Sequence, residues 1–270
     1  MRLAVSNIAW DRAEDRAAAD LLGRHGIDAV DIAPGKYFPD PAAASAADVA
    51  RVRGWWADRG FAITGMQSLL FGTTGLNLFG AADVQRAMLA HLGHVCRIAS
   101  GLGAPCLVFG SPKNRDRGGL SEEEAAAAAV DFFRRLGDVA LAHGVAICLE
   151  PNPARYGCNF MTGSAEAAEI VERTAHPAIR MQLDTGTIAV NGEDPEAVLA
   201  RSAPLIGHVH ASEPGLAPLG EGGADHAAVA RALRGVLPDS VVCIEMLTAP
   251  GEARLGAIER AVILAIREYR

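Results

Sequence analysis

Four residues with metal-binding or acid–base chemistry each end a short apolar run in the second half of the chain. The runs are VAICLE ending at Glu150, IRMQLD at Asp184, IGHVH at His210 and VVCIE at Glu245. Carboxylates are rarely buried unless they are paired or metal-bound. If these runs are parallel strands of one barrel, the four side chains converge at its mouth, where three carboxylates repel one another unless a cation lies among them. The pattern therefore predicts a divalent metal site, and this ligand set favours Mn²⁺, Mg²⁺ or Co²⁺ over a structural Zn²⁺.

The elements that would position these residues alternate along the whole chain. Strands are predicted at 2–7, 28–33, 61–67, 105–111, 145–151, 179–184, 206–212 and 241–247. Ala-rich helices are predicted over 12–25, 41–59 and 81–102, from Ser121 to before Gly144, and after Ser164, Asp194, Asp225 and Pro250-Gly251. Eight such units favour an α/β fold of the closed (β/α)8 TIM-barrel type. An open doubly wound sheet would have a Gly-rich turn after the first strand, which is missing here. No linker divides the sequence, so residues 1–270 are predicted to form a single TIM-barrel domain.

Composition narrows the class of protein. The chain has 270 residues, is 50% hydrophobic and carries a net charge of −7, an acidic balance that argues against a nucleic-acid partner. No apolar run approaches the ~18 residues of a membrane span, and the N-terminus lacks a signal-peptide cleavage pattern. We therefore expect a cytoplasmic protein without a membrane partner. Three of the five cysteines, at 106, 148 and 243, lie in predicted strands, where thiols act as small hydrophobic groups.

Each residue of the quartet also has a simpler interpretation when it is taken alone. Glu150 and Asp184 could cap a loop or a helix, and Glu245 could belong to a structural pair. A single histidine in a barrel strand is usually a core residue. His208 and His210, however, lie two residues apart on one strand face, and barrel interiors favour aliphatic side chains, so the pair favours a functional interpretation.

The segments LEPNP, QLDTG, HVHASEP and IEM, at these spacings, resemble the xylose-isomerase-like barrel superfamily. They are most similar to its sugar isomerase/epimerase branch, which includes ketose 3-epimerases, hydroxypyruvate isomerase and inosose-processing enzymes. The resemblance implies one ion, Mn²⁺ with Mg²⁺, Co²⁺ or Zn²⁺ as alternatives, held by Glu150, Asp184, His210 and Glu245. It also implies that Glu150 and Glu245 serve as the catalytic acid/base pair. Members of this branch are often dimers or tetramers, so a homo-oligomer is an expectation from the resemblance alone.

The implied chemistry is physically coherent. A metal bound to a ketose stabilises the enediolate that forms when a proton leaves the carbon beside the carbonyl. Two carboxylates on opposite faces of the substrate can remove that proton and return it from the other side, which inverts a stereocentre. Return of the proton to the neighbouring carbon would instead isomerise the sugar, and the sequence leaves both reactions open.

Three departures from the branch pattern concern the substrate. Ketose epimerases of this type usually carry a histidine where this chain has Thr187, an arginine where it has Leu216, and a second glutamate where it has Tyr156. Three polar substrate contacts are thus replaced. We therefore expect the same chemistry on a carbohydrate-like small molecule other than a free hexulose.

Residues in the loops after the predicted strands complete the predicted substrate site. The segment SPKNRDRGG places Lys113 and Arg115 where they could clamp an anionic group, although basic loop residues are usually only solvated. Aromatic residues of the first and third loops could form a wall or an apolar lid. The predicted substrate contacts are His208, Lys113, Arg115, Arg155, Trp10, Phe71 and Glu213.

The sequence leaves several functions to compare. The leading hypothesis is a metal-dependent isomerase or epimerase of a sugar, keto-sugar or cyclitol derivative. The alternative is a metal-dependent lyase that dehydrates a keto-cyclitol or a dehydroshikimate-like acid. An abasic-site endonuclease of the same superfamily would resemble a site with additional histidines for three zinc ions, which this acidic chain does not predict. A non-catalytic sugar-binding barrel would not need both Glu150 and Glu245.

Overall fold

Eight parallel strands close into one barrel in the computed structural model, which describes residues 1–249 and 251–270. They follow chain order, and β8 pairs with β1, with Val241 opposite Arg2. The predicted TIM barrel is therefore confirmed. The strands are β1 Arg2–Ser6, β2 Ala29–Ile32, β3 Ala62–Met66, β4 Cys106–Phe109, β5 Ala146–Leu149, β6 Ile179–Asp184, β7 Ile206–Ser212 and β8 Val241–Glu245.

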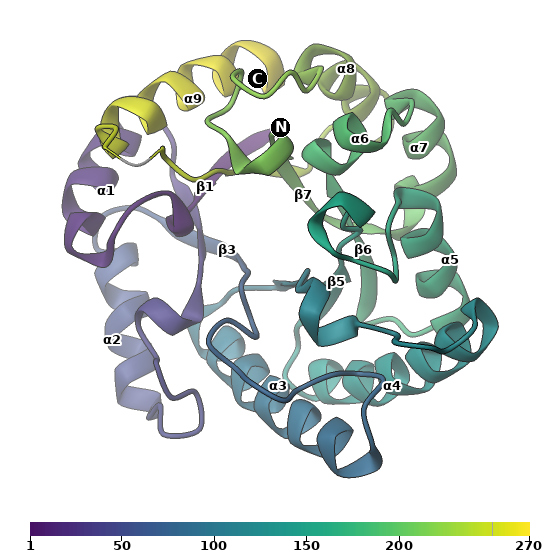
Figure 1. The fold of residues 1–270 in the computed structure, drawn as a ribbon. Coiled ribbons are helices and arrows are strands. Elements are labelled where there is room, and N and C mark those ends of the chain that lie inside the picture. The colour runs from purple at the N-terminus through teal and green to yellow at the C-terminus, as the bar shows by residue number, and fades with distance from the viewer. Residues whose placement is uncertain (250) are drawn as a thin grey trace.

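Helices surround the strands, and all but α6 form the outer layer of the barrel (Figure 1). They are α1 Asp15–Arg24, α2 Ala46–Ala57, α3 Ala82–Leu102, α4 Glu122–Ala142, α5 Ser164–Thr174, α6 Thr185–Asn191, α7 Pro195–Ser202, α8 His226–Val236 and α9 Arg254–Tyr269. The last helix was expected to follow Pro250-Gly251, and Pro250 lies outside the described residues. Among the described residues, no helix combines the length and the apolar character needed to cross a membrane.

Capping residues explain where two of the long helices begin. At α4, the Ser121 side chain accepts from the backbone N–H of Glu124, and the Glu124 carboxylate accepts from the backbone N–H of Ser121. The start of α2 was predicted too early, at residue 41. A second capping box between Ser45 and Asp48 fixes the first turn of α2 at Ala46.

The main hydrophobic core lies between the outer faces of the strands and the inner faces of the helices. Phe109 of β4 meets Phe133 of α4 edge to face with ring centroids 5.4 Å apart, and Phe132 adjoins Phe133 at 5.7 Å. Inside the barrel, small side chains of β1, β2 and β8 (Ala4, Ala29 and Cys243) pack together. Small groups there leave volume for polar side chains from neighbouring strands.

Helix α6 was not predicted. It begins directly after β6, lies nearer the centre of the barrel than α5, α7 and α8 (Figure 1), and packs against β7. Its sequence, TGTIAVN, contains glycine and β-branched residues and has little intrinsic helix propensity. The Asp184 side chain accepts a 2.6 Å hydrogen bond from the backbone N–H of Thr187 and so caps the first turn. The strand end that carries a residue of the quartet therefore also starts a helix.

Candidate metal centre

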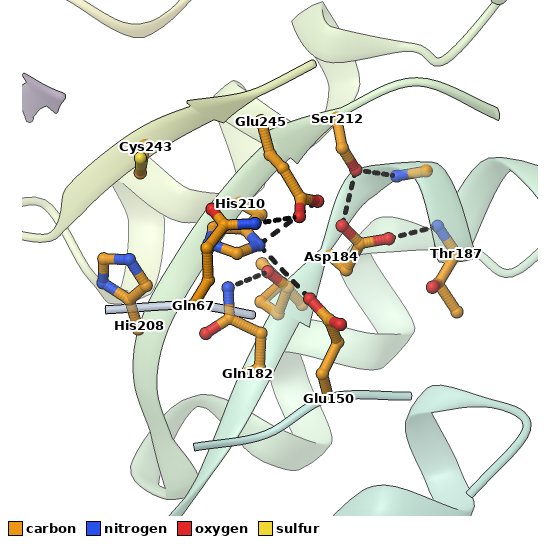
Figure 2. Close-up of polar contacts among 12 residues, drawn as sticks. Gln67, Glu150, Gln182, Asp184, Thr187, His208, His210, Ser212, Cys243 and Glu245 are labelled. Carbon is orange, nitrogen blue, oxygen red and sulfur yellow. Dashed lines mark hydrogen bonds and ion pairs between the residues drawn. The ribbon is translucent and has the colours of Figure 1, made fainter. Parts of the chain in front are cut away.

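The four residues of the quartet meet at the carboxyl ends of β5 to β8. Asp184 lies directly opposite His210 in the β6–β7 ladder, and Glu245 lies opposite Ser212 in the β7–β8 ladder. Glu150 follows β5, and its backbone N–H still donates to Phe109, so it continues the strand. One ligand atom from each of Glu150, Asp184, His210 and Glu245 lies within 4.8 Å of the others. The register of four parallel strands thus gathers three carboxylates around one imidazole (Figure 2).

The imidazole of His210 faces the carboxylates with its Nδ1 atom. This atom is 3.2 Å from Glu150 Oε1 and 3.4 Å from Glu245 Oε2. Burial opposes protonation of the imidazole, but the negative charges of Glu245 and Glu150 outweigh it and raise the pKa of His210 well above its usual value.

The pKa values of two carboxylates, Asp184 and Glu245, shift in opposite directions. Burial, followed by the charges of Glu150 and Glu245, raises the pKa of Asp184 to about 7. Burial also works against ionisation of Glu245, but the charge of His210 and hydrogen bonds from His210 and Gln67 lower its pKa. Without a cation the cluster therefore relieves its repulsion by holding protons, as expected for acidic groups forced together.

Neighbouring side chains fix the direction of each carboxylate. Gln67, at the end of β3, donates from Nε2 to Glu245 Oε1 at 2.6 Å. The Ser212 hydroxyl donates to Asp184 Oδ2. The Asn152 amide donates to Glu150 Oε2 at 3.2 Å. Each carboxylate keeps an oxygen near the centre of the cluster while its other contacts hold it in place.

A glycine makes room for one of these carboxylates. A Cβ atom on Gly110, the residue after β4, would overlap the Glu150 carboxylate. Arg115 also holds Glu150, because its Nη1 donates to the Glu150 carbonyl oxygen at 2.6 Å. The position of Glu150 thus depends on two residues of the β4–α4 loop.

The donor set fits a divalent ion. Oxygen donors from three carboxylates and one imidazole nitrogen suit Mn²⁺, Mg²⁺ or a similar cation. Glu150 and Glu245 side chains are 12% and 11% exposed, so the cluster is shielded from bulk water but open at one side. The residues that would hold the ion are Glu150, Asp184, His210 through Nδ1, and Glu245.

The cluster forms the floor of a cavity of about 470 Å³ at the barrel mouth. Lys113 lines this cavity, as do Thr187, Tyr156 and Leu216, the positions where the chain departs from the branch pattern. Phe71 lines it as well and is 83% exposed, whereas Phe79 packs edge to face on Phe160 with ring centroids 5.0 Å apart. Of the two phenylalanines of the third loop, only Phe71 is thus placed to cover the cavity.

Four other predicted substrate contacts do not line this cavity. His208 lies deeper in the barrel with Nε2 2.6 Å from Asp31 Oδ2. Arg115 is fully buried, and its Nη1 donates to the Glu150 carbonyl oxygen, so it does not lie at the cavity surface. Trp10 is buried and donates to Asp15, and Arg155 lies near the Tyr156 ring, 5.8 Å from its centroid.

Glu213 lines the edge of the cavity, but its carboxylate already has partners. It accepts from the backbone N–H groups of Gly220 and Ala224 at 2.6 and 2.8 Å, and it lies 3.2 Å from His226 Nε2. Its contacts therefore fix the loop between β7 and α8.

Sequence reasoning missed Gln67, Ser212, Gly110 and Asp31. The signal for Gln67 and Asp31 was present, because each is a polar residue in a predicted strand of the first half of the chain. The rule that selected the quartet passes over both, because Asp31 lies inside its predicted strand and Gln67 is an amide. No comparable signal marks Gly110, whose role depends on the proximity of β4 and β5.

Comparison with known proteins places this architecture in a family. A family model described as xylose isomerase-like TIM barrel matches residues 19–263. The chain belongs to this family. A comparison with curated protein sequences found no match.

Solved structures similar to this xylose isomerase-like barrel include several epimerases. D-psicose 3-epimerase from Clostridium cellulolyticum H10, solved with D-tagatose, superimposes with a TM-score of 0.84 at 16% identity over 100% of both chains. The 3-keto-D-glucoside 4-epimerase from E. coli gives 0.81 at 17% identity over 99% of each chain. The IOLI protein with a bound zinc atom gives 0.77 at 18% identity over 100% of this chain and 99% of the other. At these identities the likeness is one of fold.

We predict that divalent metal binding to the quartet strengthens as pH rises from 6 to 8. With its pKa near 7, Asp184 carries a proton at the acidic end of this range, and His210, whose pKa is also raised, does so as well. These protons must leave before the metal binds. The affinity for the metal therefore falls about tenfold for each unit by which the pH is lowered, for each proton displaced. Calorimetric titration with Mn²⁺ in buffers of different ionisation enthalpy measures both the dissociation constant and the protons released. An affinity independent of pH over this range would contradict the prediction.

We predict that Gly110→Ala disrupts the centre by displacing the Glu150 carboxylate. A displacement of about 1 Å at a reacting group can reduce a rate by ~10²-fold, and metal affinity is expected to fall with it. Gly119→Ala is the matched control, because nothing lies within 4 Å of its added methyl group in the same loop. Equal metal dissociation constants for the two variants, measured by titration with Mn²⁺, would show that Gly110 does not position Glu150.

Proposed function

We propose that this chain is a divalent-metal-dependent isomerase or epimerase that acts on a keto-sugar or cyclitol derivative. The observation that carries the proposal is the quartet itself, in which Glu150 and Glu245 both reach the floor of one cavity beside His210. The similar folds of a psicose 3-epimerase and of a keto-glucoside 4-epimerase support it. Glu150, Asp184, His210 and Glu245 would hold the ion, with Mn²⁺ as the expected one.

The two glutamates are suited to opposite proton transfers. Glu150 follows β5 and Glu245 ends β8, so they reach the centre from different sides of the barrel (Figure 2). One carboxylate removes the proton beside the substrate carbonyl, and the other delivers a proton to the opposite face. When bound, the metal ion supplies positive charge that stabilises the enediolate. Gln67 orients Glu245 and Asn152 orients Glu150, so both carboxylates are held toward the substrate.

The cavity lining supports a substituted substrate over a free hexulose. The hydroxyl of Thr187 donates to the Pro151 carbonyl oxygen, and the hydroxyl of Tyr156 accepts from the Gly215 backbone. Leu216 adds an apolar surface beside them. This part of the lining therefore presents two hydroxyls that each already have one partner, and no charged group, to the hydroxyls of an open-chain sugar. A keto-sugar with a substituent, or a cyclitol derivative, fits it better, and Lys113 supplies a cation for an acidic group on such a molecule.

Solvent exchange tests the proposed reaction. The protein is incubated with Mn²⁺ in D₂O together with free ketohexoses, a 3-keto-glucoside and a keto-inositol, and deuterium at carbon is followed by NMR. We expect metal-dependent exchange that is faster with the keto-glucoside or the keto-inositol than with the ketohexoses. Formation of a conjugated product with loss of water would favour the lyase alternative, and no exchange with any of them would contradict the proposal.

We predict that Glu245→Gln lowers this exchange by roughly 10²–10⁴-fold, the usual contribution of a positioned acid or base. Glutamine keeps the size of the side chain, so the circular dichroism spectrum and thermal unfolding should change little. Glu221→Gln removes a carboxylate that pairs with Arg260 on the surface, and it should keep full activity. Exchange at the wild-type rate in Glu245→Gln would rule out its role as an acid or base.

A further inference from the structure

A second group of polar side chains lies inside the barrel beside the metal centre. It contains Asp31 of β2, His208 of β7 and Cys243 of β8, and it shares His210 with the quartet. These residues are buried, with at most 4% of any of them exposed. In Figure 2, His208 and Cys243 lie on one side of His210, and the three carboxylates of the quartet lie on the other.

Three residues hold the carboxylate of Asp31 in position or make room for it. Its Oδ2 lies 2.6 Å from His208 Nε2, and its Oδ1 accepts a 2.8 Å hydrogen bond from the Thr64 hydroxyl. Gly65 leaves the space, because a Cβ atom there would lie 2.6 Å from Asp31 Oδ2. A carboxylate so far from water is costly unless it is bonded in this way, which indicates a role for it at this position.

The two ring nitrogens of His210 face different groups: Nδ1 faces the carboxylates of the quartet, and Nε2 faces the group around Asp31. Its Nδ1 faces Glu150 and Glu245, whereas its Nε2 is buried and has no hydrogen-bond partner among the described residues. The carboxylate recorded near Nε2 is Asp31, whose Oδ2 is 3.9 Å away. A histidine that binds a metal generally directs its other N–H to a carboxylate or carbonyl, which fixes its tautomer and orientation.

We propose that Asp31 is a positioning residue for His210, a role that rests on the proposed metal site. The negative charge of Asp31 favours the tautomer with the proton on Nε2, which leaves the Nδ1 lone pair free for the ion. His208 and Thr64 hold Asp31 in the orientation that this requires. His208, predicted as a substrate contact, thus acts on the ion only through Asp31 and His210.

The same atoms could instead form a second metal site, and the geometry disfavours it. Asp31 and His208 are in direct contact at 2.6 Å, which leaves no space for an ion between them. An ion there would also compete with the quartet for His210. We therefore expect one ion per chain.

The test measures Mn²⁺ affinity and stoichiometry independently of turnover. Free Mn²⁺ is counted by electron paramagnetic resonance during titration of the wild-type protein and of Asp31→Asn. We expect one ion per chain in the wild type and a dissociation constant ~10–100-fold higher in Asp31→Asn, the usual effect of removing such a partner. Thr64→Val removes the hydrogen bond to Asp31, together with a longer one to the Val30 carbonyl oxygen, and should give a smaller increase. If Asp31→Asn does not fold, Thr64→Val still tests whether the position of Asp31 affects Mn²⁺ binding.

Cys243→Ala tests the alternative of a second metal site, because it removes one possible ligand of this group and keeps Asp31, His208 and Thr64. Its Mn²⁺ affinity should equal that of the wild type. A second ion per chain, or weaker binding in Cys243→Ala, would make the group a metal site and overturn the proposal. Wild-type affinity in Asp31→Asn would also overturn it, whereas failure of the wild type to bind any ion would instead refute the proposed function.

A structural role for Asp31 alone would lower stability without changing the tautomer of His210. Nitrogen-15 NMR of the metal-free protein, at a pH where the His210 imidazole is neutral, distinguishes the two, because no ion then fixes the position of the proton. We expect the proton of His210 on Nε2 in the wild type and a mixture of tautomers in Asp31→Asn. An unchanged tautomer in the variant would contradict the assigned role.

Discussion

Mutual repulsion of three carboxylates is the constraint on which the site depends. The strand register sets it, since Asp184 pairs with His210 and Glu245 lies opposite Ser212, while Glu150 continues β5 at the same mouth. The fold cannot separate these groups without breaking the ladder. It must therefore supply positive charge, and the raised pKa values of Asp184 and His210 show that protons supply it when no ion does. A bound divalent cation would also compensate the negative charge, and it would stabilise an enediolate of the substrate.

The rest of the barrel holds the charged groups in place by local contacts. Gln67 and Ser212 each donate to one carboxylate, and the space at Gly110 admits another. Asp31 lies behind the imidazole, in a part of the barrel where small side chains leave room. Polar groups in a barrel core are stabilising only when they are bonded. The support network is thus a requirement of the charge cluster, and it comes mostly from strands that do not carry the quartet.

Sequence patterns predicted the barrel and the quartet because both depend on local signals. Apolar runs that end in a charged residue mark strand ends, and parallel topology brings those ends together. Asp184 was ambiguous between a cap and a ligand, and the structure shows that its capping of α6 and its place in the cluster are compatible. The direction of Arg115 toward the Glu150 backbone and the depth of His208 could not be predicted. They depend on side-chain packing between strands distant in sequence, and α6 depends on tertiary contacts that override its propensity.

Anomalous X-ray diffraction from crystals grown with Mn²⁺, recorded on both sides of the manganese absorption edge, tests the central claim most directly. The account predicts one anomalous peak about 2.0–2.3 Å from an oxygen of Glu150, Asp184 and Glu245 and from Nδ1 of His210. An absence of anomalous density among these four residues at saturating Mn²⁺ would contradict it.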